Sequence, residues 1–219
     1  LLGHGGAGKT TVAEALALLT GVTKRMGKVP DGNTISDYDK EEIKRQFSIS
    51  TTLIPLEYEG EDGPIKINLL DTPGFFDFVG EVEEAISVAD AAIIVVNCKA
   101  GIEPGTERAW EMCEKYRLPR LIFVTNMDDD HASYRELVVK LETKFGRKIA
   151  PFQLPIRENE KFVGFVNVVK MAGRRFISSG KWEARDILQR LRGVPHPGLC
   201  SEEPDHCERR FDGGSCRDQ

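Results

Sequence analysis

The sequence has no long hydrophobic run. Its longest apolar stretch, AAIIVVN at positions 91–97, is far shorter than the roughly 20 residues that a membrane-spanning helix needs. No positively charged segment followed by an apolar one opens the chain, so the pattern of a secretory signal is missing. From these absences we expect no membrane association and a cytoplasmic location.

An excess of positive charge is also missing. Lys and Arg number 30 against 35 Asp and Glu, which gives a net charge of -5 at pH 7. This balance excludes a protein that binds nucleic acid over its whole surface, although it leaves room for a local basic patch that contacts a ribosome or another RNA. With 219 residues, 40% hydrophobic and 30% charged, the chain is long enough for one globular domain and part of a second.

The first residues lack an initiating Met, and Leu1 and Leu2 lead directly into a glycine-rich loop. Such a loop normally follows a β-strand. We therefore expect the earlier residues of this strand to be missing and the chain to be a fragment.

The last part of the chain, 181–219, differs in composition from the rest. It holds six Arg against one Lys, and its three cysteines, Cys200, Cys207 and Cys216, lie too far apart for a paired-cysteine zinc motif. The final residues, GGSCRDQ, can be encoded so that reading from the second base of each codon gives Glu-Ala-Val-Ala-Glu-Thr, an ordinary helical sequence. Our hypothesis is that 181–219 is an aberrant tail read out of frame.

Short apolar strands alternate with amphipathic helices along most of the chain, and no internal repeat is evident. This alternation predicts an α/β fold with a mainly parallel sheet and helices on both faces. Two further strands with a tight turn between them add an antiparallel edge hairpin. We interpret 28–50 as a long mobile loop with a short helix at 41–45. Helices are predicted at 9–21, 78–90, 104–117 and 132–146, and strands at 52–60, 65–71, 91–97, 120–126, 150–156 and 162–169.

The segment GHGGAGKT, residues 3–10, fits the phosphate-binding pattern G-x-x-x-x-G-K-[ST] at every fixed position. Glycines let successive backbone N–H groups surround a β-phosphate, and the N-terminus of the following helix adds its positive dipole end. Lys9 reaches the β- and γ-phosphates, and the Thr10 hydroxyl ligates Mg²⁺. We therefore expect nucleotide contacts from Gly3, Gly5, Gly6, Ala7, Gly8, Lys9, Thr10 and Thr11.

A second motif, DTPG at 71–74, follows the second strand of the hairpin. A carboxylate belongs at this place because it can hold Mg²⁺ through water, and this is the role we expect for Asp71. The Gly74 N–H is expected to meet the γ-phosphate. Lys9 and Gly74 are therefore the candidate catalytic groups.

A third motif, VTNMDDD at 124–130, follows a predicted buried strand. A guanine-binding loop of the N-K-x-D type needs an aspartate that accepts from the N1 and N2 protons of the base, and Asp128 is placed to do so. Thr125 and Asn126 stand where that pattern has Asn and Lys. The alternative is that Asp129 and Asp130 only cap the next helix.

Together, GHGGAGKTT, DGNTISDYDKEEIKRQFSIS, LLDTPGFFDFVGEV and LPRLIFVTNMD resemble the translational GTPases of the elongation factor G family, in particular its bacterial elongation factor G-like branch. The resemblance covers roughly 1–180. It implies a GTP-binding domain at 1–156, with the start of an insertion within that domain at 157–180. Tetracycline-protection proteins share this architecture.

The resemblance also implies ligands and partners. These are GTP and GDP with Mg²⁺, and a ribosome contacted through later domains that are absent from this chain. We expect a monomer. In RQFSIS, Ser48 falls where the family's first switch places a magnesium-binding Thr, while Thr51 and Thr52 are close rivals for that role.

The sequence departs from the family pattern at two places. Phe75 follows DTPG, where translational GTPases usually have a His that orients the attacking water, and Phe has no polar atom for this task. Asn126 lacks the aliphatic stem that covers the base, so guanine affinity is expected to fall. Three functions remain open: a GTPase that drives a ribosomal step, a GTP-gated ribosome-binding module with little hydrolysis, and a P-loop ATPase.

Overall fold

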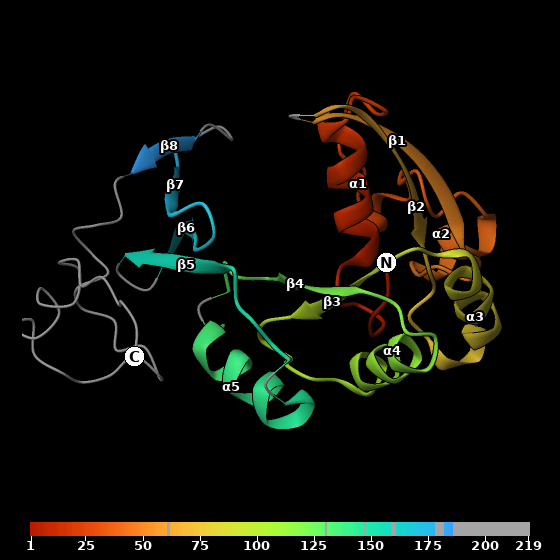
Figure 1. Ribbon diagram of the computed structural model, residues 1–219. Coiled ribbons are helices and arrows are strands. Elements are labelled where there is room, and N and C mark those ends of the chain that lie inside the picture. The colour runs from red at the N-terminus through yellow and green to blue at the C-terminus, as the bar shows by residue number, and fades with distance from the viewer. Residues whose placement is uncertain (61, 130, 147, 159–160, 178–181, 186–219) are drawn as a thin grey trace, which may run out of the picture.

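The computed structural model describes the chain except for residues 61, 130, 147, 159–160, 178–181 and 186–219. Figure 1 shows a central layer of strands with α1 on one side and α4 and α5 on the other. The helices are α1 (Lys9–Leu19), α2 (Lys40–Arg45), α3 (Val79–Val88), α4 (Pro104–Lys115) and α5 (Tyr134–Phe145), with the 3₁₀ turns η1 (Val29–Asp31) and η2 (Phe76–Phe78). The strands are β1 (Thr52–Gly60), β2 (Gly63–Asp71), β3 (Ala92–Asn97), β4 (Arg120–Thr125), β5 (Gln153–Glu158), β6 (Lys161–Asn167), β7 (Ala172–Phe176) and β8 (Trp182–Arg185).

Leu1 and Leu2 lie in the middle of the central layer. The amino group of Leu1 donates to the Leu70 carbonyl of β2, while Leu2 pairs in parallel with Ile94 of β3 through two backbone hydrogen bonds of 2.8 Å. On either side lie the antiparallel pair β1–β2 and the parallel pair β3–β4. The first two residues therefore join the two pairs.

Successive residues of the central layer enter two different apolar cores, because side chains alternate between the faces of a strand. Leu1 and Val95 pack with α1 and the hairpin, whereas Leu2 and Ile94 pack with α3, α4 and α5. Ile94 and Val95 are both fully buried. Burial on both faces explains why β3 is a continuous apolar run without polar alternation.

The predicted α/β fold is confirmed, and each predicted helix and strand is found within a few residues of its expected bounds. The strands β7 and β8 were not predicted. They extend the antiparallel pair β5–β6 into a four-stranded sheet. Gly173, Arg174 and Arg175 in β7 show no apolar alternation, so this strand depends on pairing with β6.

Two further expectations concern the end of the chain and its relation to membranes. The part of the predicted tail at 186–219 lies outside the described residues. Within the residues that the structure describes, none of the helices has both the length and the apolar character needed to cross a membrane.

The polar segment 28–50, predicted as a mobile loop, is attached to the domain by buried carboxylates. Glu14 of α1 is 1% exposed and accepts hydrogen bonds from the backbone N–H groups of Gly27, at 2.7 Å, and Ile35. Glu42 of α2 is buried and accepts from the N–H groups of Ile49 and Ser50 at 2.9 and 3.1 Å. Ion–dipole contacts of Glu14 with backbone N–H groups thus help to fix this segment to α1, in addition to the packing of Ile35 against the apolar core.

We expect Glu14→Ala to lower the free energy of unfolding by roughly 2–3 kcal/mol, because two N–H groups lose their acceptor in a buried place. Glu111→Ala is the matched control, since Glu111 is an exposed Glu on α4, and its effect should stay within about 0.5 kcal/mol. Urea unfolding followed by circular dichroism measures both. Equal effects of the two variants would contradict the assigned role of Glu14.

Candidate nucleotide-binding site

The loop 3–8 turns sharply between the Leu1–Leu2 segment and α1. Gly6 and Gly8 have φ angles of 81° and 94°, in the left-handed region, and Gly8 is the N-cap of α1. At Gly3 a Cβ atom would lie 2.4 Å from the carbonyl oxygen of Val95. Glycine is therefore required at these positions by backbone conformation or by close packing, and the loop N–H groups gather at the positive end of α1.

Lys9 is the cationic group of this loop. Its side chain is 6% exposed, and Nζ donates to the carbonyl oxygens of Gly3 and His4 at 3.1 and 2.9 Å. Burial lowers the pKa of Lys9 to about 8, while the negative charge of Asp71 opposes this shift. A bound polyphosphate would favour the protonated form in the same way as Asp71 does.

The three predicted metal ligands meet at the start of α1. The Thr10 hydroxyl donates to Oδ2 of Asp71 at 2.9 Å, and Ser48 Oγ lies 3.3 Å from Thr10 Oγ1. The rivals of Ser48 have other partners. Thr51 contacts Glu81 through both its N–H group and its hydroxyl, and the Thr52 hydroxyl donates to the Ser36 carbonyl.

Asp37 belongs to this group of side chains and was missed by the sequence reasoning. Ser48 Oγ donates to Asp37 Oδ1 at 2.7 Å, and Asp37 is buried. Burial raises the pKa of Asp37 and also that of Asp71. No spacing or periodicity marks Asp37 in the sequence, because the contact depends on how 28–50 folds back onto α1.

The side chains around Thr10 fit a magnesium ion. Asp71 Oδ1 and Asp37 Oδ2 are both buried, and neither has a hydrogen-bond partner among the described residues. Buried carboxylate oxygens without a partner are costly unless a cation or a donor compensates them. Hydroxyl and carboxylate oxygens are the ligands that Mg²⁺ prefers, so the residues present match the ion implied by the motifs.

Gly74 of the DTPG motif lies directly against the phosphate loop. A Cβ atom at this position would be 2.4 Å from Lys9 Nζ and 2.7 Å from the backbone nitrogen of Gly5. The predicted catalytic groups Lys9 and Gly74 are therefore adjacent. The absence of a side chain at Gly74 leaves its backbone close to the place where Lys9 would meet a terminal phosphate.

The predicted base-binding loop is attached to the phosphate loop by Thr125. Its hydroxyl donates to the Ala7 carbonyl at 2.8 Å. Asn126 adopts a left-handed conformation with φ 54°, which Asn tolerates better than most residues. Asp128, in the loop that follows β4, is exposed to solvent.

The alternative in which Asp129 caps the next helix is wrong, because the N-cap of α5 is Ser133, which accepts from the N–H of Glu136. Asp129 instead accepts from the N–H of His131 at 2.9 Å and forms an ion pair with Lys99 at 3.0 Å. Asp130 lies outside the described residues. Asp128 and Asp129 thus differ in their contacts although they are neighbours in the chain.

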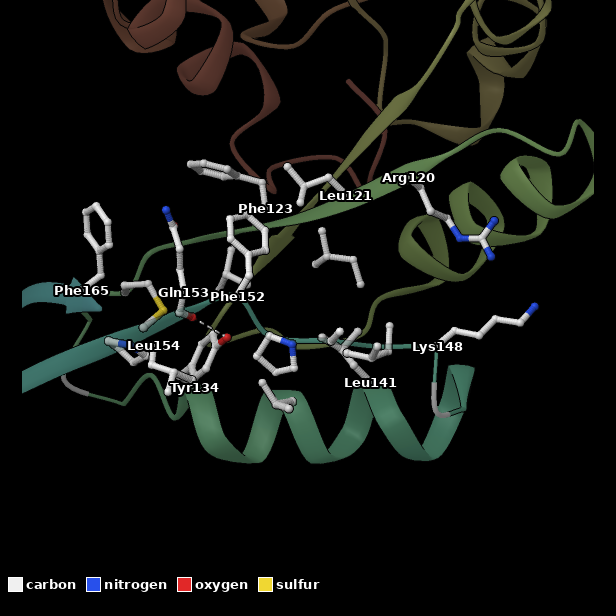
Figure 2. A pocket seen from close by; sticks show the side chains of 18 of the residues that line it. Arg120, Leu121, Phe123, Tyr134, Leu141, Lys148, Phe152, Gln153, Leu154 and Phe165 are labelled. Atoms are coloured by element: carbon white, nitrogen blue, oxygen red, sulfur yellow. Dashed lines mark hydrogen bonds between the residues drawn. The ribbon is translucent and has the colours of Figure 1, made fainter. Parts of the chain in front are cut away.

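A cavity of about 1320 Å³ lies beside the loop after β4, between β4, α5 and β5 (Figure 2). Its lining is mainly apolar and includes Leu121, Phe123 and Phe152. Among the lining residues, the Tyr134 hydroxyl donates to the Gln153 carbonyl at 2.9 Å. Asn126 and Asp128 also line the cavity, whereas none of the residues 3–10 of the phosphate loop does.

The phosphate loop, the DTPG motif and the loop after β4 meet on one α/β scaffold, and together they define a P-loop GTPase domain. The family model of the elongation factor Tu GTP binding domain matches residues 1–192. The chain therefore belongs to this family of translation-factor domains, as the motifs predicted.

Known relatives agree with this assignment. The elongation factor G-like protein of Mycobacterium tuberculosis (strain ATCC 25618 / H37Rv) is 32% identical over 226 residues, which cover 100% of this chain and 30% of that protein. Elongation factor G of Thermotoga sp. (strain RQ2) is 36% identical over 194 residues, covering 88% of this chain and 27% of that protein. A crystal structure of a Thermus thermophilus protein superposes with a TM-score of 0.80 at 37% identity, over 87% of this chain and 28% of that one. The chain thus spans less than a third of the length of these relatives.

Proposed function

We propose that this chain is the GTP-binding domain of an elongation factor G-like protein that hydrolyses GTP to drive a ribosome-associated step. The observation that supports it is the meeting of Thr10, Ser48 and Asp71, from three separate segments, at the end of the phosphate loop. Asp71 brings an unpartnered buried oxygen to this place. A site of this composition beside a buried lysine suits a nucleotide polyphosphate with its metal ion.

Each group of the chain has a role that follows from its position. The N–H groups of the loop bind the β-phosphate, and Lys9 offsets the negative charge of the terminal phosphate. The Gly74 N–H donates to the γ-phosphate, because Gly74 lies against Lys9 and Gly5. Thr10, Ser48 and Asp71 would hold Mg²⁺, with Asp37 orienting Ser48. Mg²⁺, when bound, neutralises negative charge on the β- and γ-phosphate oxygens.

Guanine selectivity is assigned to Asp128, whose carboxylate can accept from the N1 and N2 protons of the base. Thr125 supports this assignment because its hydroxyl ties the base-binding loop to the Ala7 carbonyl. The two ends of the nucleotide are thereby kept at a constant separation. Contact with the ribosome is assigned to the remainder of the protein, which we propose acts as a monomer in the cytoplasm.

A second candidate function is a GTP-gated ribosome-binding module with little hydrolysis. Phe75 favours it, because this residue supplies no hydrogen bond to an attacking water at the position after Gly74. Phosphoryl transfer depends mostly on positioning and electrostatics, and Lys9, Gly74 and the metal ligands supply both. For this reason we prefer the GTPase over the GTP-gated module as the proposed function.

Phosphate release from GTP by the intact protein, with and without ribosomes, tests the proposal. We expect turnover of GTP, a marked increase when ribosomes are added, and a loss of turnover when EDTA removes Mg²⁺. Excess MgCl₂ should restore the rate, because the metal ligands belong to the folded domain.

ATP in place of GTP is the control for base selectivity. Turnover of ATP at the rate of GTP would identify a P-loop ATPase. Tight GTP binding without phosphate release in either condition would identify the GTP-gated module instead.

A further inference from the structure

The ring of Phe75 lies on the phosphate loop. A Cβ atom at Gly5 would stand 3.1 to 3.3 Å from three atoms of this ring, which is closer than the roughly 3.5–4.0 Å of an optimal contact between carbon atoms. Phe75 therefore fits in this place because residue 5 has no side chain. The phosphate loop and the residue after DTPG are matched in shape.

Phe47, which precedes Ser48, covers the Phe75 ring from another direction. The two ring centroids are 4.7 Å apart at an interplanar angle of 57°, and the ring of Phe78 lies 6.3 Å from that of Phe47. These are favourable tilted arrangements of aromatic rings. The Phe75 ring is thus in contact with the phosphate loop through Gly5 and with the segment of Ser48 through Phe47.

The neighbouring Phe76 has different contacts although its exposure is similar. It is 46% exposed against 42% for Phe75. Its ring lies 6.4 Å from the ring of His4, and the Arg108 guanidinium lies 5.4 Å from its centroid. Phe76 therefore serves as a matched control for any effect of the Phe75 ring.

We propose that Phe75 is a positioning residue for the γ-phosphate contact of Gly74. The ring, held between Gly5 and Phe47, keeps the preceding residue beside Lys9, where the Gly74 N–H meets the terminal phosphate. The inference rests on the proposed function for the identity of the ligand. This positioning role requires a large apolar ring and no polar atom, and the Phe75 side chain meets both requirements.

The test compares affinities for GDP and for a non-hydrolysable GTP analogue with an imido bridge, in variants of the intact protein. Phe75→Leu should weaken binding of the GTP analogue by about tenfold, the value of one hydrogen bond to a charged group. GDP has no γ-phosphate, so its affinity should change by less than about twofold. Phe75→Tyr adds a hydroxyl at Cζ, the ring atom nearest to the Gly5 side-chain position, and should therefore lower the ratio of the two affinities as well.

Two further variants separate the positioning role from a general structural one. Phe47→Leu should lower the affinity ratio in the same direction, and adding it to Phe75→Leu should give less than the product of the two effects, because both act on one contact. Phe76→Leu should leave the ratio unchanged. Equal weakening of both nucleotides in Phe75→Leu, or no weakening, would overturn the positioning role.

This readout does not depend on hydrolysis. If the wild-type protein binds the analogue but releases no phosphate from GTP, the proposed GTPase function fails, while the affinity ratio still decides the role of Phe75. If the wild-type protein binds neither nucleotide, both proposals are overturned.

Discussion

GTP turnover should fall by roughly 100- to 1,000-fold in Lys9→Met, the range found when one charge-stabilising donor is removed from an active site. Lys9 is buried, and its Nζ lies next to Gly74 and the loop carbonyls. Met keeps the length and apolar character of the stem but brings no charge. The loss should therefore appear in both the affinity for GTP and the rate of phosphate release.

Lys24→Met is the control for this variant, because Lys24 is exposed and follows α1. It removes the same charge from the surface and should keep wild-type turnover. Melting temperatures of both variants show whether the fold is retained. A Lys9→Met protein that turns over GTP at the wild-type rate would contradict the proposed site.

Guanine selectivity should be lost in Asp128→Asn. The guanine base offers two N–H donors to one carboxylate, and an amide cannot accept both, so we expect the affinity for GTP to drop by roughly 100-fold. Xanthine carries a carbonyl where guanine carries its amino group. The amide N–H of Asn can donate to that carbonyl, so xanthosine triphosphate should bind the variant better than GTP does.

Asp129→Asn is the matched control, since the two aspartates are adjacent in the chain. Asp129 accepts from the His131 N–H and pairs with Lys99, so its replacement should preserve the preference for guanine. Competition of GTP, xanthosine triphosphate and ATP against a fluorescent guanine nucleotide measures both variants. A guanine preference that survives in Asp128→Asn would move base recognition to another residue.

Several contacts in the site could not have been predicted from local patterns. Glu14 lies in α1 but accepts from Gly27 and Ile35. A charged residue in a helix is usually exposed, and no pattern marks this one as buried. The capping box at Asp39 and Glu42 is a recognisable sequence signal, yet the additional bonds that Glu42 accepts from the loop after α2 depend on the path of that loop.

The aromatic contacts were also outside what sequence reasoning could give. The sequence shows that the position after DTPG holds Phe75, whose side chain has no polar atom. Its packing against Gly5 and Phe47 requires that three distant segments approach one another. A single sequence gives no information on such distances. The chemical character of Phe75 could therefore be inferred from the sequence, but its neighbours in space could not.

Local sequence patterns were sufficient to predict the phosphate loop, the DTPG motif and the alternating helices and strands. They were therefore sufficient to predict the class of the fold. Each of these is a contiguous pattern whose physical cause, a backbone conformation or an apolar period, acts over a few residues. The position of Ser48, rather than Thr51 or Thr52, beside Thr10, the contact of Asp37 with Ser48, and the packing of the Phe75 ring against Gly5 were decided by tertiary structure alone. They depend on how residues 28–51 pack against α1 and α3, and that packing comes from carboxylate contacts and aromatic rings that have no periodic pattern in the sequence.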